Sequence, residues 1–305
     1  MALRSYLATE VALDHVDGLL TRREALHRLG LLGLSTAAAS GLLSACAGEA
    51  PAPTPAPPSA AGAEPSAPAK PDYDVAAATA RTRSITFPGG AGTMFGAYAV
   101  AQNPRGAVLV VHENRGLTDH IRAVAGRLAG DGYSALAPDL LSRAGGTATA
   151  AAAAKDATAA LGGISEADLV ADLRSGLAEL RRRASGASLG IVGFCFGGGM
   201  VWQLLNSGPT DLAAAVPFYG PAPDDPHFTG AKAAVLGIFA QQDDRVNAGR
   251  DILDRALTAA GVPHEFVTEP DAGHAFFNDT GARYNPAAAT DAYRRLLDWF
   301  GAHLG

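Results

Sequence analysis

Short apolar runs alternate with amphipathic stretches from about residue 81 to the end of the chain. Residues 107–112, AVLVVH, are apolar almost throughout, which is typical of a strand covered on both faces. The pattern predicts further strands over 84–87, 94–100, 133–137, 188–193, 212–217, 233–239 and 264–268. It predicts helices near 119–130, 148–160, 165–180, 198–206, 247–260 and from Asn285-Pro286 onward.

The order of these elements predicts an α/β fold. Repeated β-α-β units with buried strands imply a mostly parallel central sheet with helices on both faces. The strands at 84–87 and 94–100, joined by PGGAG, are expected to form an antiparallel pair at the sheet edge. No internal repeat or linker interrupts the chain after residue 81, so we expect residues 81–305 to form a single domain.

Composition narrows the class of protein only slightly. The chain is 48% hydrophobic and 18% charged, with a formal net charge of -6, as in ordinary soluble globular proteins. It has no long basic run, which argues against a nucleic-acid partner. The two cysteines, Cys46 and Cys195, lie in no C-x-x-C or His-rich pattern, so no metal site is expected.

The first 45 residues show features of an export signal in the usual order. An Arg22-Arg23 pair precedes a weakly apolar run from Leu29 to Ala45, and the run ends in LSAC at Cys46. With about 17 residues, the run is short for a permanent transmembrane helix. LSAC resembles a bacterial lipobox, whose cysteine is lipidated and becomes the mature N-terminus. We therefore expect residues 1–45 to be a twin-arginine lipoprotein signal; the alternative is a surface helix with a chance Arg-Arg pair.

Residues 46–80 are expected to be a lipidated cysteine followed by a disordered tether. Residues 47–70 are mostly Ala, Pro and Ser, a composition that cannot bury a core. Such a spacer would hold the domain at 81–305 away from a membrane that carries the Cys46 anchor. We therefore expect an exported protein on the extracytoplasmic, periplasmic side of a bacterial membrane. Apolar residues at near-helical spacing within residues 1–20 have no function in this interpretation.

The turn Gly193-Phe194-Cys195-Phe196-Gly197 joins an expected strand to an expected helix and has the G-x-nucleophile-x-G form. Such a turn brings the residues two before and two after its centre into close contact, so neither can carry a bulky side chain. The central side chain is exposed by strained backbone, and the helix N-terminus favours thiolate over thiol. We expect Cys195 to be a nucleophile, with a buried structural cysteine or a peroxide-sensing thiol as alternatives.

A nucleophilic thiol needs a base, and the base needs an orienting acid. Enzymes with this turn place them in the chain order nucleophile, acid, histidine. Among the four histidines after Cys195, His274 follows the final expected strand and is the expected base. The loop after strand 233–239 offers Asp243 and Asp244 as the acid, and position along the chain leaves both open, with Asp271 a weaker third choice.

The loop that follows AVLVVH, residues 113–117, is expected to supply one N–H of an oxyanion hole. The other would come from the residue after the nucleophile, Phe196. Glu113 falls at the mouth of the expected site, with a surface carboxylate as the alternative. His112 and Glu113 do not begin an H-E-x-x-H zinc motif, because residue 116 is Gly116.

Together these segments resemble the dienelactone hydrolase (carboxymethylenebutenolidase) family, cysteine-dependent members of the α/β-hydrolase superfamily. The similarity covers about residues 84–303, through VVHENRGLTDHIRAVAGRLAGDGYSALAPDLL, IVGFCFGGG, FAQQDDRVNAG and DAGHAFFNDTGARY. It implies an α/β-hydrolase fold and the following roles: Cys195 nucleophile, Asp243 acid, His274 base, Glu113 the carboxylate that contacts the resting thiol, and backbone N–H groups of Asn114 and Phe196 the oxyanion hole.

The resemblance implies hydrolysis of a carboxylic ester or lactone through an acyl-enzyme, without metal or organic cofactor. We expect the protein to be a monomer. Family members that act on the chlorocatechol-pathway lactone bind its carboxylate with arginines, one of them four residues after the catalytic histidine. That position here is Asn278, and the segment 148–160 offers Lys155 but no arginine. We therefore expect a broader or different small ester or lactone. The alternatives are a lipid-anchored binding protein without turnover and a redox-active thiol protein.

Overall fold

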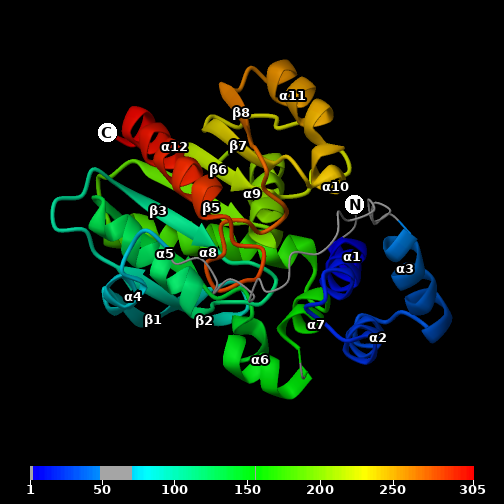
Figure 1. Cartoon of the computed structure of the whole chain (residues 1–305). Helices are drawn as coiled ribbons and strands as arrows, with labels where there is room; N and C mark the ends of the chain where they lie inside the picture. The colour runs from blue at the N-terminus through cyan, green and yellow to red at the C-terminus, as the bar shows by residue number, and fades with distance from the viewer. Residues whose placement is uncertain (1–2, 49–70, 155) are drawn as a thin grey trace, which may run out of the picture.

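A single eight-stranded sheet forms the centre of the computed structural model, which describes residues 3–48, 71–154 and 156–305 (Figure 1). Its strands are β1 (Thr82–Gly89), β2 (Gly92–Ala99), β3 (Gly106–Val111), β4 (Tyr133–Pro138), β5 (Leu189–Phe194), β6 (Leu212–Phe218), β7 (Ala234–Ala240) and β8 (His264–Glu269). They are ordered β1-β2-β4-β3-β5-β6-β7-β8. β1 pairs antiparallel with β2 and β2 with β4, and every later pair is parallel.

All eight predicted strands are present, within two residues of the expected bounds. β3, β4, β5 and β7 are buried at every position, as their continuous apolar runs predict. The edge pair β1–β2 turns at Gly90 and leaves one face of β1 exposed. The prediction of a mostly parallel sheet is confirmed.

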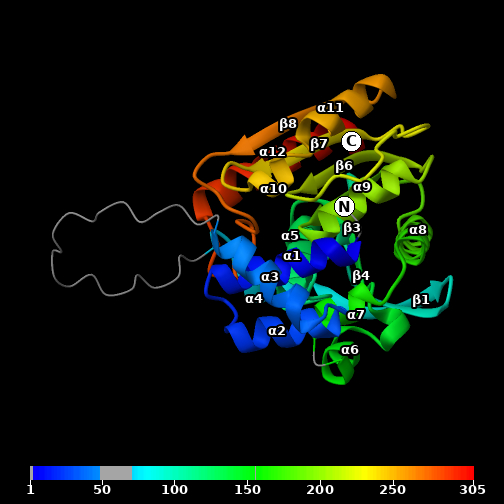
Figure 2. The same ribbon diagram turned by 90° about the vertical axis from the view of Figure 1, so that its right-hand side faces the viewer.

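Helices cover both faces of the sheet, as predicted. α5 (Asp119–Gly130) and α12 (Pro286–Leu304) pack on one face, and α8 (Glu166–Arg183) and α9 (Phe196–Asn206) on the other (Figures 1 and 2). Local chemistry sets the helix starts, because the Ser165 hydroxyl caps α8 and the Asn285 side chain caps α12, where Pro286 follows. α11 (Arg250–Ala259) follows a short α10 (Asp244–Asn247) on the connection between β7 and β8.

The alanine-rich stretch predicted as one helix forms two. α6 (Thr147–Ala154) and α7 (Ala157–Gly162) flank Lys155, which lies outside the described residues, and a one-turn 3-10 helix (Ser142–Ala144) precedes them. The Asp156 carboxylate accepts a bond from Thr158 N at 2.8 Å and so begins a new helix. Periodicity could not predict this break, because a run of alanines has no apolar face to count.

Residues 3–48 form three helices: α1 (Leu3–Val16), α2 (Arg22–Leu31) and α3 (Thr36–Gly48). α1 and α2 contact α7, and α3 packs on the outer side of α1 and α2 (Figures 1 and 2). Thr21 caps α2 in a capping box with Glu24, so Arg22 and Arg23 occupy the first turn of this helix. In the described part of the chain, no helix has both the length and the apolar character that crossing a membrane requires. The signal and anchor interpretation remains a prediction.

We expected the tether to extend to residue 80, but the structure has a helix within that range. Residues 49–70 lie outside the described residues, and 46–48 belong to α3. Residues 75–80 form α4 (Val75–Ala80), capped by Asp74 and packed on α5 so closely that a Cβ on Gly126 would lie 1.8 Å from the Ala78 carbonyl oxygen. The composition that suggested a linker is that of residues 47–70, whereas the missing side chain of Gly126 lets α4 pack against α5, so the domain begins before residue 81.

Candidate active site

The turn at Cys195 has the geometry that its glycines predict. Cys195 has φ 55° and ψ -118°, in the left-handed half of backbone space that L-residues rarely adopt. A Cβ on Gly193 would lie 2.2 Å from the carbonyl oxygen of Gly197, and a Cβ on Gly197 would lie 2.4 Å from that of Val111. Neither glycine can be replaced without moving the backbone, and the strand-turn-helix junction therefore holds the thiol at the carboxyl edge of the sheet.

His274 and Asp243 meet on the loops after β8 and β7. Nδ1 of His274 lies 2.5 Å from Oδ2 of Asp243, and both side chains are buried. Asp243 also caps α10, since its Oδ1 accepts a bond from Val246 N at 3.4 Å. Asp244 is exposed, so of the two aspartates that the sequence left open, Asp243 is the partner of the imidazole.

The thiol and the imidazole are joined by a third group that the sequence did not predict, Glu10 of α1. Sγ of Cys195, Nε2 of His274 and a Glu10 carboxylate oxygen lie within 4.8 Å of one another. The Glu10 Oε2 atom is 3.5 Å from Nε2 and 3.8 Å from Sγ. The Tyr6 hydroxyl, one turn earlier on α1, lies 3.2 Å from the same sulfur.

The near-helical spacing of Leu7 and Val11 was the sequence signal that could have found α1. Both side chains are buried, at 0% and 1% exposure, and the helix is held by ion pairs of Glu10 with Arg245 and of Asp14 with Arg283. The spacing predicts a helix, but it does not predict the surface on which the helix docks.

Charge around the site favours a protonated imidazole and a neutral thiol. Burial alone would lower the pKa of His274, but the carboxylates of Glu10 and Asp243 hold that pKa well above its usual value. Burial raises the pKa of the Cys195 thiol, and the Glu10 charge raises it further against the opposing effect of His274. Burial likewise raises the pKa of the Tyr6 hydroxyl well above its usual value. In this arrangement the charge of the imidazolium is balanced by the carboxylates of Glu10 and Asp243, and not by a thiolate at Cys195.

The same three side chains offer sulfur, nitrogen and oxygen donors of the kind that bind zinc. The fit is poor, because the Glu10 carboxylate is already paired with the Arg245 guanidinium. A metal ion at this position would have a cationic neighbour. The contacts of Glu10 fit an ion pair better than a metal site.

Glu113 lies at the mouth of the site, as expected, but its contacts differ from those that the resemblance implies. Its Oε2 atom accepts a bond from Asn278 Nδ2 at 2.5 Å, and its buried Oε1 atom has no hydrogen-bond partner among the residues that the structure describes. Among the described residues, the hydrogen bonds of the Cys195 sulfur run to Tyr6 and Glu10. The position that the resemblance gives to the Glu113 carboxylate beside the resting thiol is occupied by Glu10.

A cavity of about 310 Å³ opens beside Cys195 and His274. Its walls include Glu113 and Asn114 from the loop after β3, Asn278 from the loop after β8, and Glu10 from α1. Arg115 and Arg283 also line it, and sequence reasoning assigned neither. Phe196 is the first residue of α9, so its N–H has no acceptor within the helix and is available to a bound group.

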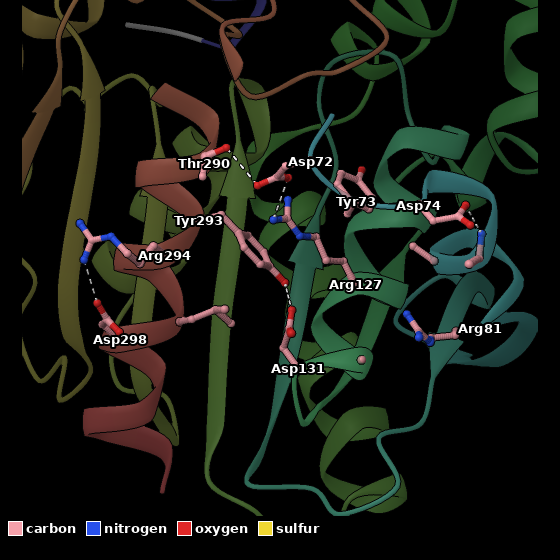
Figure 3. Close-up of a pocket in the computed structure, with 14 residues that line it drawn as sticks. Asp72, Tyr73, Asp74, Arg81, Arg127, Asp131, Thr290, Tyr293, Arg294 and Asp298 are labelled. Carbon is pink, nitrogen blue, oxygen red and sulfur yellow. Dashed lines mark hydrogen bonds and ion pairs between the residues drawn. The ribbon is translucent and has the colours of Figure 1, made fainter. Parts of the chain in front are cut away.

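A second hollow, of about 580 Å³, lies among α4, α5 and α12, away from Cys195 (Figure 3). Several of its polar groups are paired with one another: Arg127 contacts Asp72, and the Tyr293 hydroxyl donates to Asp131 at 2.7 Å. The Arg127 guanidinium also stacks over the Tyr293 ring, 3.5 Å from its centroid. These pairs fasten the start of the domain to α5 and α12.

The Dienelactone hydrolase family model matches residues 95–304, about two thirds of the chain and all of the site except α1. The chain belongs to this family. It is 35% identical over 210 residues to a "Putative carboxymethylenebutenolidase" of Methylorubrum extorquens, covering 65% of this chain and 72% of that protein. It is 31% identical to a protein of the same name from Synechocystis, covering 73% of this chain and 98% of the other.

Solved structures agree with this membership. The crystal structure of a "Putative Dienelactone Hydrolase" from Klebsiella pneumoniae is 30% identical and superposes with a TM-score of 0.62, over 73% of this chain and 98% of that one. The fold is that of the α/β hydrolases, and the chain is a hydrolase of ester or lactone bonds. Nearly the whole of the Klebsiella chain superposes on 73% of this chain. The remainder of this chain is long enough to contain the helices α1–α3.

Proposed function

We propose that this hydrolase cleaves small carboxylic esters or lactones with Cys195 as nucleophile, His274 as base and Asp243 as the acid that orients the base. The observation that carries the proposal is the combination of a strained Cys195 at a strand-helix turn with an imidazole that Asp243 holds at 2.5 Å. Family membership supports the substrate class, since the matched relatives are named for lactone hydrolysis.

The reaction begins when His274 Nε2 takes the thiol proton and the sulfur attacks the carbonyl carbon. A C–S bond forms as the carbonyl π pair moves to oxygen. The oxyanion then re-forms the carbonyl, the C–O bond to the leaving alcohol breaks, and His274 returns the proton to that alcohol. Water, deprotonated by the same imidazole, attacks the thioester and releases the acid and the thiol. Asp243 accepts a bond from Nδ1–H and so keeps the neutral ring in the tautomer that has its lone pair on Nε2.

The oxyanion would be stabilised by backbone N–H groups at the mouth of the cavity. Phe196 contributes the free N–H of the first helical residue, and Asn114, which lines the same cavity, contributes the second. In the family mechanism a carboxylate at Glu113 contacts the thiol and is displaced by substrate. Glu113 can approach Cys195 in this way only when Glu10 has left the sulfur.

Hydrolysis of p-nitrophenyl acetate by the purified protein tests this proposal. Cys195→Ala is expected to abolish turnover, and Cys46→Ala is the matched control that should retain it. Full activity in Cys195→Ala would refute the nucleophile assignment. If wild type shows no activity, both as the full chain and after removal of the residues before Cys46, a binding or redox role is favoured. Comparing esters and lactones with and without a free carboxylate then tests the consequence of Asn278, from which we expect no strong preference for the carboxylate.

We further propose that the protein is exported by its Arg22-Arg23 signal and anchored through lipid on Cys46. The order of the twin arginine, the apolar run and LSAC supports this proposal. Cell fractionation of wild type, Cys46→Ala and an Arg22→Lys/Arg23→Lys double variant tests it. We expect membrane association in wild type only, with Cys46→Ala unanchored and the double variant retained in the cytoplasm. Equal distribution of all three would contradict the proposal.

A further inference from the structure

Two side chains of helix α1 lie against the Cys195 sulfur, beside the cavity that opens there. Attack on a carbonyl requires the carbon to come to about 3–3.5 Å from the sulfur. The Tyr6 hydroxyl oxygen already lies at that distance, 3.2 Å from Sγ of Cys195. A Glu10 carboxylate oxygen lies 3.8 Å from the same sulfur. Cys195 is 3% exposed, and Tyr6 and Glu10 are themselves buried at 1% and 2% exposure. A substrate carbonyl cannot take the positions beside the sulfur that these two side chains fill.

Glu10 also disables the base. Its carboxylate lies 3.5 Å from the Nε2 atom of His274, the nitrogen that must take the thiol proton. An imidazolium held between Glu10 and Asp243 has no free lone pair at Nε2 with which to act as a base. The negative charge beside the sulfur also disfavours a thiolate. The helix therefore opposes both the approach of substrate and the activation of the nucleophile.

Helix α1 is held on the domain by ion pairs and a cation–π contact. Glu10 pairs with Arg245, whose guanidinium also lies over the Tyr6 ring at 4.7 Å from the centroid. One turn later, Arg283 donates to Asp14 at 3.0 Å and to Asp17 at 2.7 Å. Acidic groups on one face of the helix thus meet arginines at the rim of the site.

Apolar packing on the same helix supports these ion pairs. Leu7 and Val11 are fully buried, and Leu7 lies near Gly162 at the end of α7. Arg4 donates to the Gly162 carbonyl oxygen at 3.3 Å, and on the following helix Arg28 pairs with Asp156 at 3.0 Å. The helices α1 and α2 are therefore anchored on the α7 side of the site as well as at the thiol.

We propose that the surface around Cys195, Arg245 and Arg283 is a docking site for the chain's own N-terminal helix, and that α1 is an intramolecular inhibitor of the hydrolase. The proposal rests on the proposed role of Cys195 as nucleophile. α1 lies entirely before Cys46, so cleavage in front of that residue during export would separate it from residues 46–305. The segment that directs export would then also keep the enzyme inactive until export is complete.

The test uses the full chain with a protease recognition sequence inserted between residues 49 and 70. Two quantities are measured before and after cleavage and removal of the N-terminal fragment: the alkylation rate of Cys195 by iodoacetamide, followed by peptide mass spectrometry, and kcat/KM for p-nitrophenyl acetate. We expect both to rise at least tenfold. A synthetic peptide of residues 1–20 should restore the inhibition, competitively with the ester.

Full-chain variants guard against a cleaved domain that fails to stay folded. Glu10→Gln keeps the shape of the side chain but removes its charge, and it should raise the alkylation rate several-fold without cleavage. Glu24→Gln is the matched control, since it makes the same change on an exposed residue of α2. It should alkylate as slowly as wild type. Thermal melting of each variant checks that the fold is intact.

The outcomes separate this inference from the proposed function. Esterase activity that depends on Cys195 but is unchanged by cleavage and by Glu10→Gln would overturn the inference and leave the function standing. Faster alkylation without any esterase activity would support occlusion by α1 while refuting the hydrolytic role of Cys195. Equal alkylation rates in wild type, Glu10→Gln and Glu24→Gln would overturn the inference even if the cleaved protein were lost to aggregation.

Discussion

The Asp243 carboxylate holds the His274 imidazole at 2.5 Å, through Oδ2 and Nδ1, although the two residues are on different loops. Gln242 N donates to the Ala272 carbonyl oxygen at 2.9 Å and ties the two loops together beside this pair. The carboxylate meets the imidazole because the backbone of both loops is fixed at the sheet edge. The pair therefore exists before any substrate is bound.

Asp243→Asn is expected to reduce kcat for ester hydrolysis by about 10⁴-fold, because an amide can hold the imidazole in the wrong tautomer. The fold should be unchanged, since Asn remains a good N-cap for α10. Kinetics of the protein freed of residues before Cys46 would measure the effect. The control is Asp244→Asn, an exposed neighbour, which should stay within about twofold of wild type; equal losses in the two variants would contradict the assignment of Asp243.

Gly193→Ala is expected to destabilise the protein by about 1–3 kcal/mol or more, because its Cβ would lie 2.2 Å from the Gly197 carbonyl oxygen. Urea unfolding followed by circular dichroism would measure the free energy of unfolding. Gly41→Ala is the matched change within α3, where a Cβ meets nothing within 4 Å. That substitution should be neutral or stabilising by up to about 1 kcal/mol. Comparable stability of the two variants would show that the turn does not require glycine.

Glu269→Gln is expected to remove part of the pH dependence of stability. Burial at the end of β8, together with the Asp291 charge, raises the pKa of Glu269 to about 7. Because the folded pKa exceeds the unfolded one, the stabilisation is present below about pH 4.3 and is lost as the pH rises through 7. The variant should therefore gain stability relative to wild type between pH 5 and 8, by at most about 1.4 kcal/mol per pH unit.

Urea unfolding at several pH values would check this expectation. Glu265→Gln alters an exposed carboxylate on the same strand and is the matched control. Its difference from wild type should be the same at pH 5 and pH 8. A flat difference for Glu269→Gln as well would show that its buried carboxyl does not take up a proton on folding.

Asp279→Ala is expected to destabilise the protein by about 1–3 kcal/mol for each polar group left unsatisfied, because it removes the acceptor that His120 and Tyr73 share. The Asp279 carboxylate is 2.7 Å from His120 Nδ1 and accepts a bond from the Tyr73 hydroxyl, also at 2.7 Å. These bonds fix the loop that carries His274 to α5 and to the start of the domain. Asp298→Ala, an exposed change on α12, should cost less than about 0.5 kcal/mol; equal costs would contradict the anchoring role.

The strands, most helices and the cysteine turn could be predicted from the sequence because each depends on neighbours in the chain. Burial on both faces requires continuous apolar runs such as that of β3, and the Cys195 turn requires glycine at positions 193 and 197 for purely local steric reasons. His274 was predictable from chain order in the same way. These features need no knowledge of which distant segments meet.

The tertiary structure alone decided which groups surround the thiol. Position along the chain leaves Asp243 and Asp244 equivalent, and only the family resemblance favoured Asp243; in the structure, the cap of α10 turns Asp243 toward His274 and leaves Asp244 exposed. Glu10 lies 185 residues from Cys195 along the chain, and its contact with the sulfur depends on where α1 docks. Docking is set by the summed packing and ion pairing of two distant surfaces, and a pattern along one segment carries information about only one of them.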